Sequence, residues 1–63
     1  MIELHRLGTH GEPVWLNPDL ITTIEAHPDT VIALATGTKV MVAESVDEVI
    51  DKVREWRASI ARG

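Results

Sequence analysis

One segment near the C-terminus constrains the fold more than any other, because it carries both the start signal and the periodicity of an amphipathic helix. Ser45-Val46-Asp47-Glu48 is a capping box: the Ser45 side chain caps the first turn, and the Glu48 side chain reaches back to it. This pattern predicts a helix over residues 46–61. The helix has one apolar stripe at helical spacing, formed by Val46, Val49, Ile50, Val53, Trp56 and Ile60. A single stripe of this kind needs the apolar face of a sheet to cover it.

The residues before this helix have the composition of short strands separated by turns. Aliphatic and β-branched residues recur in segments that are bounded by Gly, Pro, Asn and Asp. This pattern predicts an α+β fold, in which a small antiparallel sheet of about five short strands is covered by the C-terminal amphipathic helix. The predicted strands cover residues 2–7, 14–16, 20–26, 30–35 and 38–43.

Two connections between the predicted strands contain residues with specific turn chemistry. Asn17 precedes Pro18-Asp19, and its side chain can cap a single helical turn that starts at the proline. Pro28-Asp29 suits a turn between the third and fourth strands, because the ring presets the proline φ for position i+1. Each of these residues therefore has a backbone role that needs no ligand.

The remaining turn and the strand register follow from side-chain pattern. Gly37 predicts a type I turn closed by a glycine bulge, because a two-residue primed turn would force the β-branched Thr36 to positive φ. Alternation along the strands predicts one core face and one mixed face, provided that the connection at Pro28 has an odd length. The predicted core face carries Leu20, Ile24, Ile32, Leu34, Val40 and Val42, and the mixed face carries Thr23, Glu25, Val31, Ala33, Lys39 and Met41.

The length and composition predict one domain over residues 1–63 with an aliphatic core. Hydrophobic residues make up 44% of the chain, but there is no Phe or Tyr and there are only two Trp. The chain has no cysteine, so no disulfide can stabilise it. A domain this small buries only about 60% of the surface that its unfolded chain exposes. We therefore predict close packing and self-association into a homo-oligomer as a further source of burial.

Charge and hydropathy argue against several classes of protein. The net charge of −4 disfavours nucleic-acid binding, which needs clustered Lys and Arg. The chain has no apolar run of the roughly 18 residues that a membrane-spanning helix needs, so we expect no membrane insertion. The first residues also lack the basic and apolar regions of a signal peptide. Together with the lack of cysteine, these features predict a cytoplasmic protein.

The residues of chemical interest do not have the spacing of a catalytic, cofactor-binding or metal-binding site. His5, His10 and His27 lack HxH or HxxxH spacing, and no cysteine joins them. Ser45 is used by the capping box, and there is no GxSxG, Walker or GxGxxG motif. We therefore predict a non-enzymatic protein with no cofactor and no bound metal.

Protein–protein contact is the remaining function class for which the sequence offers candidate residues. Tryptophan is enriched at interface hot spots and is also a filler of small cores. Trp56 lies on the helix stripe, which favours the core, whereas Trp15 lies on a short strand beside a glycine-containing loop and suits either role. Val31 and Met41 on the mixed face are further contact candidates, with ordinary exposed apolar surface as the alternative.

Several segments follow one another in an order and spacing typical of one family. They are Leu16-Asn17-Pro18-Asp19-Leu20-Ile21, Pro28-Asp29-Thr30-Val31-Ile32, and Glu44-Ser45-Val46 with Glu48-Val49-Ile50. Over nearly its whole length the chain resembles the FlbD/SwrD family of small flagellar and swarming motility proteins. The chain departs from the family pattern at Trp15 and Met41, where Phe or Tyr is expected. The resemblance implies a role in swimming or swarming, such as support of motor output, and it implies no catalytic residue.

Two hypotheses of different kinds therefore stand. The favoured one is a cytoplasmic, non-enzymatic accessory of the bacterial flagellum that contacts flagellar proteins through Trp15, Val31 and Met41. The alternative is a small nucleic-acid-binding regulator of motility genes, because five short strands followed by a helix are similar in order to the CsrA-type RNA-binding proteins. Binding of that type would need a basic edge, whereas Arg6 and Lys39 are dispersed here.

Overall fold

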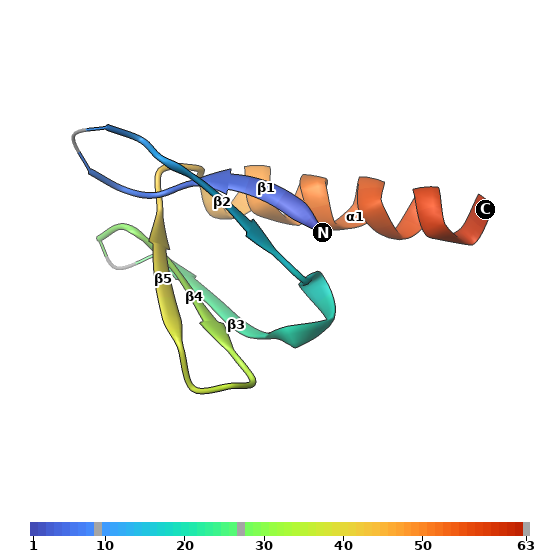
Figure 1. Ribbon diagram of the computed structural model, residues 1–63, viewed down its shortest axis with the longest axis horizontal. Coiled ribbons are helices and arrows are strands. Elements are labelled where there is room, and N and C mark those ends of the chain that lie inside the picture. The colour runs from blue at the N-terminus through green and yellow to red at the C-terminus, as the bar shows by residue number, and fades with distance from the viewer. Residues whose placement is uncertain (9, 27, 63) are drawn as a thin grey trace.

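The protein folds as short antiparallel strands followed by one long helix (Figure 1). The computed structural model describes residues 1–8, 10–26 and 28–62. The predicted α+β fold is confirmed. In chain order the elements are β1 (Ile2–His5), β2 (Pro13–Leu16), the 3₁₀ turn η1 (Pro18–Leu20), β3 (Ile21–Ala26), β4 (Thr30–Leu34), β5 (Lys39–Val42) and α1 (Val46–Arg62).

The strands are divided between two sheets, a β1–β2 hairpin and a three-stranded sheet of order β3-β4-β5. The end of the hairpin meets the end of β5, where Arg6 and Val42 form an isolated bridge. On either side of it, the Leu7 N–H donates to the Met41 carbonyl at 3.0 Å and the Ala43 N–H donates to the His5 carbonyl at 2.8 Å. Within the described residues, the two sheets are therefore joined at this short junction.

The register of the three-stranded sheet follows the predicted alternation, with one correction. Ile24 pairs with Ile32, and Ala26 pairs with Thr30, so the β3–β4 connection has the odd length that the prediction required. The expectation that Leu20 lies on the core face is wrong, because its side chain is 40% exposed. The Leu20 N–H donates to the Asn17 carbonyl at 3.0 Å, and this bond places the residue in η1 instead of in the strand.

A β-bulge brings Ile21 to the position that Leu20 was expected to take. The pairing register shifts between Ile21 and Thr23, so that Ile21 pairs with Leu34. The hydroxyl of Thr22, the residue between them, donates to the Ala33 carbonyl at 3.0 Å. Ile21 is consequently half-buried against the core.

The core is aliphatic, as predicted, and it is built by both sheets and the helix. In the described part of the chain its buried members are Ile2, Leu4, Leu16, Ile32, Val40, Val42 and Val49. Helix α1 contacts β1 and β3, and Trp56 packs half-buried against this core. The expected burial of Ile60 is wrong: it is 58% exposed, because the C-terminal turns of α1 extend past the strands (Figure 1).

The predicted turns are present where the structure describes them. The Asn17 side chain accepts from the Asp19 N–H at 3.1 Å, with Pro18 at the first position of η1. The Gly37 N–H donates to the Leu34 carbonyl at 2.9 Å, and Gly37 has a φ of 91°, which confirms the type I turn with a glycine bulge. Pro28 and Asp29 lie between β3 and β4, whereas His27 lies outside the described residues.

The capping box at the start of α1 is formed. The Glu48 N–H donates to Ser45 Oγ at 3.2 Å, and the Ser45 N–H donates to Glu48 Oε1 at 3.4 Å. Two N–H groups that have no partner within the helix are satisfied in this way.

Loss of this cap is expected to lower stability by a measurable amount. We expect Ser45→Ala to reduce the free energy of unfolding by about 1 kcal/mol, because it removes the acceptor for the Glu48 N–H. Thermal and urea unfolding followed by circular dichroism measure this change. Ser59→Ala, at an exposed position within the same helix, is the control and should change stability by less than about 0.5 kcal/mol. Equal effects of the two substitutions would contradict the capping role.

Candidate functional site

Exposed apolar side chains line the outer face of the three-stranded sheet. Val31 on β4 pairs directly with Met41 on β5, and the Leu7 N–H donates to the Met41 carbonyl from the end of the hairpin. Met41 is 47% exposed and Leu7 is 44% exposed, whereas Val31 is half-buried. These three residues are here called the outer row. Val31 and Met41 alternate with core residues such as Ile32 and Val42 on β4 and β5, whereas Leu7 follows β1 and is joined to the row by its backbone bond to Met41. Alternation therefore places Val31 and Met41 on the face that turns away from the core.

Polar residues border the outer row. Glu25 on β3 pairs with Val31, and Lys39 on β5 lies two residues before Met41 on the same face. The outer row is thus an apolar strip with charged neighbours. This arrangement resembles the apolar centre and polar rim of a protein–protein interface.

Trp15, the other predicted contact residue, lies in the other sheet. It is on β2 opposite Glu3, and its side chain is 57% exposed. Of the three predicted contact residues, the structure therefore pairs Val31 with Met41 and leaves Trp15 on the hairpin. Leu7 was missed by the sequence analysis, because only the junction between β1 and β5 brings it beside Met41.

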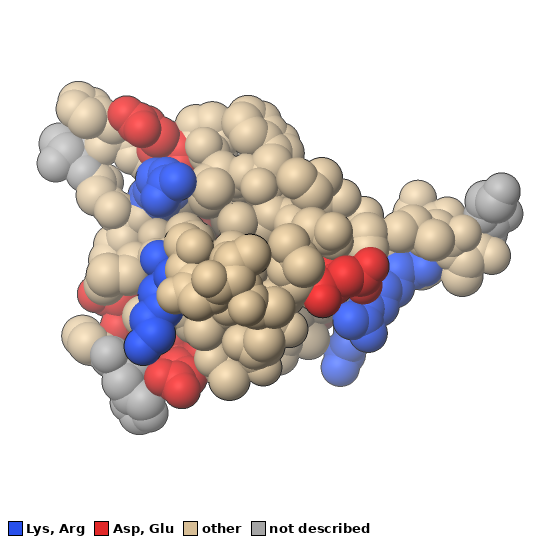
Figure 2. Space-filling model, turned by 60° about the horizontal axis from the view of Figure 1, so that its bottom comes forward, with Lys and Arg blue, Asp and Glu red and all other residues tan. Residues whose placement is uncertain are grey.

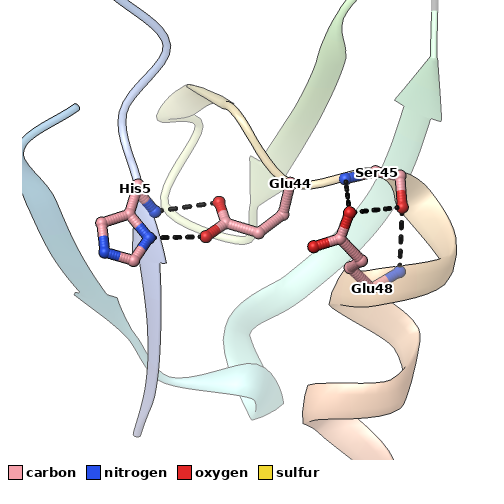
Figure 3. A network of polar contacts seen from close by, with 4 residues as sticks. All are labelled: His5, Glu44, Ser45 and Glu48. Atoms are coloured by element: carbon pink, nitrogen blue, oxygen red, sulfur yellow. Dashed lines mark hydrogen bonds and ion pairs between the residues drawn. The ribbon is translucent and has the colours of Figure 1, made fainter.

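A buried carboxylate forms a second feature that the sequence analysis did not predict. Glu44 precedes the helix cap and is 9% exposed, and both of its oxygens interact with His5 at the end of β1 (Figure 3). Glu44 Oε1 accepts from the His5 backbone N–H at 2.9 Å. Glu44 Oε2 lies 2.7 Å from His5 Nδ1, which donates to the ionised carboxylate. The two residues are 39 positions apart, so no local pattern signals their contact.

The surroundings of Glu44 determine its protonation. Burial acts to raise the pKa of the Glu44 carboxyl, but the hydrogen bonds from the His5 side chain and backbone act in the opposite direction. The net result is a pKa below the ordinary value of 4.5. Glu44 is therefore ionised at neutral pH, and it ties the loop before α1 to the end of β1.

The described residues contain neither a metal-site grouping nor a membrane-spanning helix. Across residues 1–8, 10–26 and 28–62, no three His, Asp or Glu side chains are grouped as a metal site would require. Nor does α1, within its described length, combine the length and apolarity needed to cross a membrane. His5 instead contacts Glu44.

Comparison with known proteins identifies the family. Residues 1–61 match the family model FlbD, described as flagellar and swarming motility proteins. The chain belongs to the FlbD family. The resemblance inferred from the sequence is confirmed, and membership makes this a motility-related protein. No curated protein and no solved structure gave a significant match.

The segments that carry the FlbD resemblance have structural roles in this chain. Asn17 caps η1, and Ser45 with Glu48 caps α1. Glu44, which lies in the same FlbD-like segment as Ser45, binds His5. These segments therefore specify turns, caps and one long-range polar contact.

Proposed function

We propose that this FlbD-family protein is a non-enzymatic accessory of the bacterial flagellum that acts in the cytoplasm by binding other proteins. The observation that carries the proposal is the outer row of a motility-family chain, in which Val31 and Met41 pair on the outer face of a sheet and the exposed Leu7 is bonded through its backbone to Met41. Exposed apolar strips of this kind with polar borders are typical of protein contact sites.

The chemistry of the outer row suits a particular kind of partner. Met41 is unbranched and polarizable, so it can adapt to an irregular apolar surface. Glu25 and Lys39 beside the row offer one charge of each sign for orientation of the partner. We expect a flagellar protein that presents an apolar ridge with polar flanks. Trp15 on the hairpin offers a second, separate contact point.

The first experiment is an in-frame deletion of the gene in the native host, with motility scored and filaments counted in the same cells. Weakened motility with normal filament numbers supports an action on the working motor. Loss of filaments points to assembly or gene expression, and it would favour the alternative of a nucleic-acid-binding regulator. Unchanged motility on both swimming and swarming plates would contradict the proposal.

A substitution in the outer row tests the contact itself. Restoring the deletion strain with Met41→Asp should leave motility near that of the deletion, because a charge at the centre of an apolar contact costs the partner about 2 kcal/mol or more of binding energy. Thr36→Asp, which places the same charge at the exposed tip of the β4–β5 hairpin, is the matched control and should restore motility. Both purified variants should unfold at temperatures close to that of the wild type. Full motility with Met41→Asp would exclude the outer row as the contact site for the partner.

A further inference from the structure

The C-terminal turns of α1 expose apolar side chains beyond the sheets. The helix continues past the strands in Figure 1, and its stripe continues with it through Trp56 and Ile60. Trp56 is half-buried, but Ile60 is 58% exposed. An amphipathic helix normally buries its whole stripe. The end of this stripe is left without cover from the strands of the same chain.

An open apolar groove lies directly beside this helix end. Its volume is about 300 Å³, and it runs between α1 and the β3 side of the protein. Pro18, Ile21 and Ile24 line one wall, and Val53 and Arg57 contribute to the other. A second hollow of about 290 Å³ is lined by Asp19, Trp56, Arg57, Ile60 and Ala61. Arg57 lines both hollows, so they are neighbours, and together they are here called the helix-end surface.

The helix-end surface carries charges of both signs around its apolar centre. Asp19 lies on the η1 side, and Arg54 and Arg57 lie on the helix side. Basic side chains gather on the projecting part of the helix in Figure 2. A purely basic rim would suit an acidic peptide, but a rim with an acid on one side and bases on the other is complementary to itself.

We propose that the helix-end surface is a self-association site at which two copies of this chain pair about a two-fold axis. The projecting helix end of each copy lies in the groove of the other, so that Ile60 packs on the half-buried Ile21 and Ile24 of the second copy. Arg57 of each copy faces Asp19 of the other. A two-fold contact of this kind uses the same patch twice and is closed, so it yields a dimer and no larger assembly.

The size of the exposed surface supports a second copy as the occupant. A compact monomer of this mass is expected to expose about 4,000 Å², whereas this chain exposes 4389 Å². The projecting helix contributes to that excess, and an apolar helix end from a second copy is an element that can fill the groove. The site is separate from the outer row, and the proposal does not rest on the flagellar function.

The oligomeric state of the purified protein tests the proposal directly. We expect sedimentation equilibrium to give a dimer within the range up to about 1 mM. Ile60→Asp should raise the dissociation constant by about tenfold or more, because it places a charge in the apolar centre of the contact. Met41→Asp, on the outer row, should leave the dimer unchanged. Unchanged circular dichroism of Ile60→Asp would show that the variant is folded, since the side chain is already exposed.

A charge exchange tests the symmetry. Asp19→Arg alone should weaken the dimer, because it opposes arginine to Arg57 of the second copy, and Arg57→Glu alone should weaken it by opposing glutamate to Asp19. A mixture of these two variants should form a heterodimer of near wild-type affinity, because both cross-contacts then join opposite charges. A contact with an unrelated acidic peptide would not be restored by mixing.

Three results would overturn the proposal. They are a wild-type protein that stays monomeric up to about 1 mM, a dimer that Ile60→Asp does not weaken, and a mixture of the charge variants that stays dissociated. None of these results bears on the flagellar proposal, which is tested by motility and by substitution in the outer row. Conversely, a deletion strain that stays motile would contradict the flagellar proposal and would not affect the dimer proposal.

Discussion

Replacing Leu4 with alanine is expected to leave most of the protein unfolded at room temperature. Leu4 on β1 is fully buried, at the centre of a core that includes Ile32, Val42 and Val49. Truncation of a buried leucine to alanine costs about 2–5 kcal/mol, because the transfer energy is lost and a cavity remains. A core in a domain of this size rarely supplies more than about 3–5 kcal/mol of net stability. The expected loss is therefore as large as the whole stability of the fold.

The measurement is urea unfolding of the wild type and the variant, followed by far-UV circular dichroism. Leu7→Ala is the matched control, since it makes the same chemical change at a side chain that is 44% exposed. We expect the control to lose less than about 1 kcal/mol. A Leu4→Ala variant that keeps a cooperative transition near the wild-type midpoint would show that the core is not organised around β1.

Protein concentration should modify this result. If two copies associate, the folded state gains stability by mass action, and the unfolding midpoint rises with concentration. The Leu4→Ala variant should then be less folded at low concentration than at high concentration. Ile60→Asp disrupts the proposed dimer. In the same concentration series, its unfolding midpoint should therefore not depend on protein concentration.

The elements that the sequence predicted correctly are those specified by neighbouring residues. The capping box of Ser45 and Glu48 lies within one helical turn, and the Gly37 turn is defined by adjacent residues. Alternation along β4 and β5 likewise placed Val31 and Met41 together on the outer face. In each case the physical cause acts within a few residues, so the sequence alone contains the necessary information.

The features that the sequence did not predict depend on competition between local structures or on distant contacts. Leu20 suits a strand, but its N–H donates to the Asn17 carbonyl within the turn that begins at Pro18. The β-bulge then places Ile21, in place of Leu20, opposite Leu34. The division into two sheets depends on where β1 meets β5. The contact between Glu44 and His5 joins residues that are 39 positions apart. Only the folded chain shows these relationships.

Loss of the Glu44 carboxylate is expected to have the second largest effect on stability. Glu44→Ala removes the acceptor for the His5 backbone N–H and the partner of His5 Nδ1. Because hydrogen bonds to charged groups are stronger than neutral ones, we expect the free energy of unfolding to fall by about 2 kcal/mol at neutral pH. The His5 side chain is 46% exposed and can turn to water, which keeps the expected loss at this level. Glu44→Gln retains an oxygen acceptor for the backbone N–H and should lose roughly half as much.

The pH dependence of stability distinguishes the contribution of the Glu44 charge from that of its hydrogen-bond geometry. In the folded protein the pKa of this carboxyl lies below its ordinary value of 4.5, so near that pH the unfolded chain binds more protons than the folded chain. The stabilisation from the carboxylate is therefore complete above pH 4.5 and is lost as the pH falls through the lower folded pKa. Unfolding measured from neutral pH into the acid range should show the wild type converging on Glu44→Gln.

Glu3→Gln is the control for this titration. Glu3 is exposed on β1 opposite Trp15, so the same substitution there should change stability by less than about 0.5 kcal/mol. A constant difference between the wild type and Glu44→Gln across the acid range would contradict a role for the charge. In that case the advantage of glutamate over glutamine would come from the geometry of its hydrogen bonds and would be the same at any pH.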